Sequence, residues 1–172
     1  MKKFLALLLA ALFLASCGAP RPKVPIASAY KFEGIAYTHL QKHNPKKFVY
    51  QSPEAVEKRY DEQLLAALKE ANLLDQNSTD ELKITIKHHR GFMGEDSPFT
   101  SDRIGGIDVA YQVQIIRGGQ VLRNYTQDEF EFYNPGFFAT MKTVAMQNTD
   151  DSYENDAIAA MVKRLMEIIK KF

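Results

Sequence analysis

The most constraining feature of this sequence is a pair of apolar segments joined by two glycines. The first segment alternates apolar with polar residues, and its apolar positions are Ile107, Val109, Tyr111, Val113 and Ile115. The second runs from Val121 to Tyr133 and becomes acidic and aromatic near its end. Between them, Gly118 and Gly119 favour a tight hairpin, because glycine accepts the positive φ of primed turns. These segments therefore predict two antiparallel strands.

Two further segments have the pattern of strands. From Glu81 to Arg90, apolar residues alternate cleanly with polar ones, which indicates one buried and one solvated face. Residues 29–37 are aromatic-rich and roughly alternating, although Gly34 weakens the pattern. Residues 39–47 read as a basic loop, and residues 91–106 as a long glycine-containing loop.

Two segments predict amphipathic helices, at 53–72 and 152–171. The first begins with Ser52 as N-cap and Pro53 in the first turn. Acidic residues crowd the start of the second and basic residues its end, as the helix dipole favours. A short helix is also predicted around Phe137 to Ala145.

The resulting order is strand, helix, three strands, helix. Strands in one group with helices on one face predict an α+β two-layer sandwich. The sheet should have about four strands and be mainly antiparallel. We expect one domain spanning residues 29–172, with Leu68 and Leu165 in its core.

The N-terminus has the layout of an export signal. Lys2 and Lys3 precede an apolar run from Phe4 to Ala15 that is too short to span a bilayer. The residues Leu14-Ala15-Ser16-Cys17 resemble the lipobox of bacterial lipoproteins. This resemblance implies cleavage after a signal peptide of residues 1–16, and acylation of Cys17 with chains such as palmitate. Because Cys17 is the only cysteine, no intramolecular disulfide can form.

Residues 17–28 contain several prolines and predict an extended tether between the lipid and the domain. By analogy with enteric sorting, Gly18 rather than Asp after the cysteine favours the outer membrane, with the domain facing the periplasm. Surface display is one alternative, and an ordinary secreted protein with a chance cysteine is another.

The layout also resembles that of small envelope lipoproteins, including the lipopolysaccharide-assembly lipoprotein and auxiliary lipoproteins of transporters. The resemblance rests on the element order and on the segment at 64–74, which precedes an alternating strand. It contains no invariant site motif, and it therefore assigns no functional residue.

The sequence offers no clear catalytic or cofactor motif, so we expect neither an enzyme nor a bound cofactor. His88 and His89 are adjacent on a strand and point to opposite faces, with His88 at the edge of the core. His88 paired with Asp128 or Glu129 is the enzymatic alternative.

The net charge of the chain is near neutral, at +1, and it falls to near −1 without Lys2 and Lys3. This charge does not indicate nucleic-acid binding.

A zinc site is a further alternative. His39 and His43 have a spacing that would suit zinc on a helix. However, Pro45 and neighbouring lysines indicate a loop, and no third ligand is nearby.

Aromatic residues in two loops suggest partner binding. The candidate partner-binding residues are Phe92, Met93, Phe99, Phe137 and Phe138. They could instead fold back over the sheet. Together with the lipid anchor and a possible exposed strand edge, they predict a binding or scaffolding subunit of an envelope complex for transport, assembly or maintenance. The alternative is a carrier that holds an apolar ligand, such as a lipid, between sheet and helices.

Overall fold

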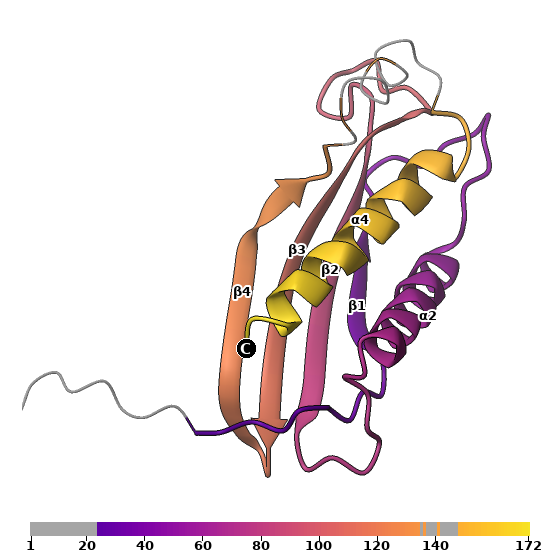
Figure 1. Ribbon diagram of the computed structural model, residues 1–172. Helices are drawn as coiled ribbons and strands as arrows, with labels where there is room; N and C mark the ends of the chain where they lie inside the picture. Colours follow the sequence, from indigo (N-terminus) through magenta and orange to yellow (C-terminus); the bar gives the residue numbers. More distant parts are fainter. Residues whose placement is uncertain (1–23, 135, 137–140, 142–147) are drawn as a thin grey trace, which may run out of the picture.

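The computed structural model describes residues 24–134, 136, 141 and 148–172. In these residues the elements are β1 (Ile35–Leu40), α2 (Pro53–Glu70), β2 (Glu81–Phe92), β3 (Ile104–Arg117), β4 (Gln120–Phe132) and α4 (Ser152–Ile169). Figure 1 shows both helices on one face of a single sheet, with α4 crossing it diagonally. The predicted α+β two-layer architecture is confirmed.

The sheet has four strands in the order β1-β2-β3-β4. β1 and β2 are parallel, because α2 carries the chain back between them. The other two pairs are antiparallel. Gly118 and Gly119 join β3 to β4 with φ of 54° and 81°, in the left-handed region that glycine adopts most readily. The predicted hairpin is therefore confirmed.

Both long helices form as the sequence predicts. The Ser52 hydroxyl accepts a hydrogen bond from the backbone N–H of Ala55 (3.3 Å) and caps α2. Leu68 of α2 and Leu165 of α4 are completely buried, as expected for core residues. The short helix predicted around Phe137 to Ala145 lies almost entirely outside the described residues.

The core lies between the sheet and the helices. Apolar residues at alternate positions of β2 and β3 bury one face under α2 and α4, and they are Leu82, Ile84, Ile86, Val109, Tyr111, Val113 and Ile115. On the opposite face of β2, Lys83 and Lys87 are exposed. The period of two in the sequence thus separates a packed face from a solvated one.

The first strand lies later in the chain than predicted. Tyr30 and Lys31 form only isolated bridges. Gly34 then has φ of +124°, and a Cβ at this position would lie 3.3 Å from the carboxylate of Asp61. Regular pairing begins after this break, so β1 includes His39, and the prediction that this residue lies in a loop is wrong.

The long loop is also shorter than predicted. Gly91 and Gly106 pair with each other in the β2–β3 ladder, which moves the ends of both strands into the predicted loop. Phe92 therefore belongs to β2 and not to the loop.

The end of the predicted tether is fixed to the domain. Arg123 and Arg117 donate hydrogen bonds to the carbonyl oxygens of Val24 (2.9 Å) and Pro25 (3.1 Å), and the N–H of Ala27 donates to Asp80 (2.7 Å). Figure 1 shows this segment at the end of the sheet that carries the β3–β4 hairpin. Among the described residues, no helix combines the length and apolar character needed to cross a membrane.

Candidate functional site

The two edges of the sheet differ in length and protection. β1 has 6 residues, and its first N–H donates to the carboxylate of Asp61 (2.8 Å). β4 has 13 residues, and no strand in the described part of the chain pairs with its outer side. Phe130 and Phe132 on β4 are 46% and 54% exposed. β4 is therefore the long, open and partly aromatic edge.

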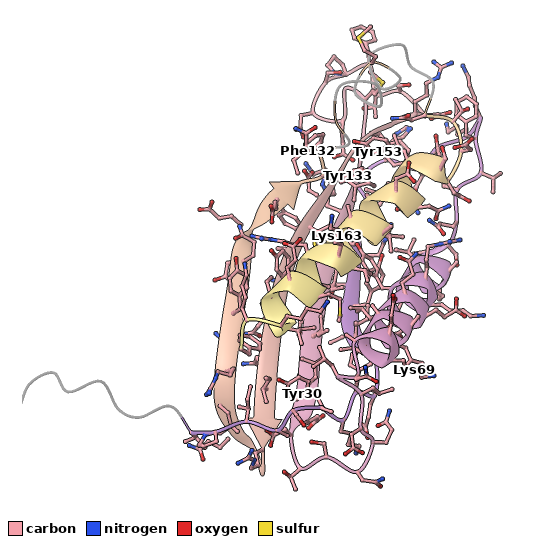
Figure 2. The ribbon with its side chains drawn as sticks, in the orientation of Figure 1. Tyr30, Lys69, Phe132, Tyr133, Tyr153 and Lys163 are labelled. Carbon is pink, nitrogen blue, oxygen red and sulfur yellow. The ribbon has the colours of Figure 1, made fainter. Side chains whose placement is uncertain are left out.

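A groove lies beside this edge, where the diagonal α4 leaves the end of β4 uncovered. Figure 2 shows Phe132 and Tyr133 of this region near the N-terminal half of α4. The groove has a volume of about 270 Å³ and a mainly apolar lining that includes Val109, Phe132, Ala157, Ala160 and Met161. Glu131 and Arg164 supply its charged groups. A groove between a strand edge and a helix can receive the side chains of an added strand.

Carboxylates follow the open edge next to the groove. Asp128, Glu129 and Glu131 lie within four residues of β4. The hydroxyl of Tyr111 donates a hydrogen bond to Glu131 (3.3 Å). None of the three carboxylates forms an ion pair with a described residue. This stretch, called here the acidic edge segment (128–132), thus carries three carboxylates, and Arg164 in the groove lining is the cation that interacts electrostatically with Glu131.

A second polar cluster is buried between α4 and β2. Glu154 is completely buried and accepts hydrogen bonds from Arg90 Nε (2.9 Å) and Nη2 (2.6 Å). The Nε2 atom of His88 lies 2.9 Å from Oε1 of Glu154, and the His88 Nδ1 atom lies 3.1 Å from the hydroxyl of Tyr60. Gln51 also donates to Glu154 (2.9 Å). Side chains of β2 and of the segment before α2 therefore meet at one carboxylate of α4, and Tyr60 of α2 joins them through His88.

Burial and hydrogen bonding have opposite effects on the charge of Glu154 in this cluster. Burial acts to raise the pKa of Glu154, but the hydrogen bonds from His88 and Arg90 outweigh it and lower the pKa to about 2. An ionised Glu154 accepts a hydrogen bond from Nε2 of His88, and the hydroxyl of Tyr60 lies 3.1 Å from Nδ1 on the other side of the ring. The buried Arg90 guanidinium thus faces the buried Glu154 carboxylate.

A polar hollow of about 680 Å³ lies above the cluster and is lined by His39, Gln41, Gln51 and Arg90, among others. Arg90 is already engaged, since it also donates to the side chain of Gln41 (3.0 Å) and the carbonyl of Gln51 (2.9 Å). Burial, and then the charge of Arg90, lowers the pKa of His39. Because the charged groups below the hollow are partnered, this cluster is suited to holding α4 on the sheet.

The three described residues among the predicted partner-binding residues differ in exposure. Phe92 is 4% exposed and packs edge-on against His43 and Tyr50, so it belongs to the core. Met93 is half-buried, whereas Phe99 is 86% exposed. Phe137 and Phe138 lie outside the described residues.

The histidines also have distinct partners. His89 lies on the outer face of the sheet. Its Nδ1 atom is 3.1 Å from Oδ2 of Asp108, and its Nε2 atom is 3.1 Å from Oε2 of Glu95. His43 contacts Asp102 (2.6 Å). The part of the chain that the structure describes contains no group of three or more side chains placed to hold a metal ion.

The enzymatic alternative required His88 to meet Asp128 or Glu129. Both ring nitrogens of His88 instead have partners, Tyr60 and Glu154. That pair is therefore not formed.

Sequence reasoning missed the role of Glu154, because the helix dipole alone explained an acid in the first turn of α4. A signal was present in the spacing. Glu154 precedes Ala157, Ile158 and Met161 by three, four and seven residues, which places it on the buried face of the helix. Arg90 likewise continues the buried alternation of β2.

Comparisons with protein-family models, with curated proteins and with solved structures found no match to this chain. The function must therefore be inferred from the sequence and the geometry described above.

Proposed function

We propose that this chain is a lipid-anchored binding and scaffolding component of a bacterial cell-envelope complex. Cys17 attaches it to the outer membrane, and the domain faces the periplasm. Complexes for transport, assembly or envelope maintenance are the class of partner. The observation that carries the proposal is the open β4 edge with its exposed Phe130 and Phe132. An unprotected edge of this kind is a hazard in a free protein and a template in a binding protein.

A lipid anchor on Cys17 would keep the open β4 edge close to partners in the same membrane. Residues 18–23 separate the proposed acylated Cys17 from Val24, which is already fixed to the domain. A chain of this length spans at most about 25 Å. The domain would therefore stay close to the bilayer, which raises its effective concentration for partners in the same membrane.

The lipid-carrier alternative has less support. A carrier needs an apolar cavity between the sheet and the helices. Buried side chains fill this space in the described residues, and they include Tyr60, Leu64, Ile86, Ile115 and Leu165. The groove beside β4 is open and carries Glu131 and Arg164.

A non-catalytic role agrees with the partners of the titratable groups. A general base needs a free acceptor within reach of a substrate. Glu154 is buried and holds Arg90, His88 and Gln51. Its engagement supports a structural function for the cluster.

Native envelopes provide the test. We expect the wild-type chain to incorporate a palmitate analogue, to fractionate with membranes, and to crosslink to a specific envelope protein identified by mass spectrometry. Cys17→Ala should abolish labelling and membrane association. Labelling of Cys17→Ala, or the absence of any crosslinked protein partner with the wild type, would contradict the proposal.

Two serine substitutions locate the contact. Phe130→Ser removes an exposed aromatic ring from β4, and Phe99→Ser removes one from the loop after β2. We expect Phe130→Ser to weaken crosslinking and Phe99→Ser to leave it unchanged. The reverse result would move the binding surface to the loop.

A further inference from the structure

We propose that the groove between β4 and α4 binds an extended, basic segment of a partner protein. This segment adds to the β4 edge and inserts an apolar side chain next to Ala160. The inference rests on the proposed binding function and specifies the chemistry of the partner.

The geometry of the groove favours an added strand. It lies on the helix-covered face, directly beside the unpaired side of β4, and it includes Val109 of β3 and Met161 of α4. Every second side chain of a strand added to β4 would point toward α4. The backbone would gain hydrogen bonds along the edge, and the groove would receive one of these side chains.

The polar groups at the groove match the side chains and charge of such a segment. The Nε atom of Arg164, a residue of the groove lining, is buried and has no hydrogen-bond partner among the described residues. A side-chain oxygen of the added strand that points toward α4 can accept this donor. Asp128, Glu129 and Glu131 make the same stretch of edge negative, which complements lysine or arginine in the partner.

α4 offers a matched pair of positions for the test. Ala160 lines the groove, whereas Ala159 is the neighbouring exposed alanine and does not line it. Ala160→Trp should fill the groove. Ala159→Trp introduces the same side chain into the same helix and controls for effects on folding, which thermal unfolding of both variants will check.

The probe is an acetylated, amidated nine-residue peptide in which lysine alternates with valine or leucine. Its binding to the full-length protein in detergent is measured by fluorescence anisotropy. We expect Ala160→Trp to weaken binding at least tenfold, and Ala159→Trp to change it less than twofold. Glu129→Lys should also weaken binding, and raised salt should reduce it. Hydrogen exchange should show new protection in the acidic edge segment.

Three results would overturn the inference. These are no binding of the lysine peptide, equal binding of a peptide with glutamate in place of lysine, or equal effects of the two tryptophan variants. A dimer in sedimentation that Ala160→Trp abolishes would identify a second copy of this chain as the occupant, which also contradicts it. If envelope crosslinking succeeds while these tests fail, the binding function stands and its location on β4 does not.

Discussion

Two buried carboxylates at opposite ends of the sheet each pair with an arginine, but in different surroundings. Glu154 and Asp80 are both completely buried. Arg90, the partner of Glu154, is 3% exposed, whereas the side chain of Arg117, the partner of Asp80, is 39% exposed. The first pair lies between a helix and the sheet, and the second lies where the N-terminal segment joins the domain.

The comparison shows that similar ion pairs can have different structural effects. In the Glu154 cluster both charged groups are buried away from water. Removal of either one would therefore leave the other buried without a counter-ion. At Asp80 the hydrogen bonds from Arg117 lower the pKa of the carboxyl, but solvent screens the exposed guanidinium. We therefore expect the Glu154 cluster to control the stability of the whole domain, and the Asp80 pair to control the attachment of residues 24–28.

The largest effect is expected for Glu154→Ala. Arg90 would remain buried without its anion, and the free energy of unfolding should fall by about 3–5 kcal/mol. Urea unfolding followed by circular dichroism measures the loss. The double variant Arg90→Met/Glu154→Leu removes both charges and should recover part of it. A single variant that is as stable as the wild type would show that the cluster is not a structural constraint.

The free energy of unfolding should depend on pH through the carboxylate of Glu154. Glu154 has an ordinary pKa of 4.5 and a folded-state pKa of about 2. The unfolded chain therefore binds this proton at higher pH than the folded chain. The contribution of Glu154 is full above pH 4.5 and is lost as the pH falls toward 2, by on the order of 3 kcal/mol. Glu154→Gln should have a shallower acid dependence, and an unchanged slope would refute the assignment.

A smaller effect is expected for Arg117→Ala. Asp80 keeps the N–H of Ala27 as a partner, so the loss of stability should be about 1–2 kcal/mol. Hydrogen exchange should increase at Ala27 and change little at Ile158 in α4. Faster exchange throughout the domain would mean that this pair also supports the core.

The smallest effect is expected for Lys58→Ala on the exposed face of α2. The Nζ atom of Lys58 lies 3.7 Å from Oε1 of Glu62, and both side chains are mainly exposed. The change in unfolding free energy should be about 0.3 kcal/mol. A loss of unfolding free energy as large as that of Arg117→Ala would contradict the expectation that exposed ion pairs contribute less to stability than buried ones.

The sequence predicted the elements better than their mutual contacts. The alternation in β2 placed His88 on the buried face, and the structure confirms this with complete burial. Its contact with Glu154 joins residues 66 positions apart, which no local pattern specifies. Gly34 weakened the predicted first strand, but the position of the break became clear only from its φ and its approach to Asp61.

The sequence by itself determined the class of fold, because periods of two and 3.6 residues decide which faces can be buried. It also determined the hairpin, since two adjacent glycines accept the required backbone angles. The tertiary structure alone decided which strand remains an open edge, where α4 leaves a groove, and which acid is buried against Arg90. These features depend on the diagonal packing of a helix across strands distant in sequence, and therefore on contacts that local periodicity does not encode.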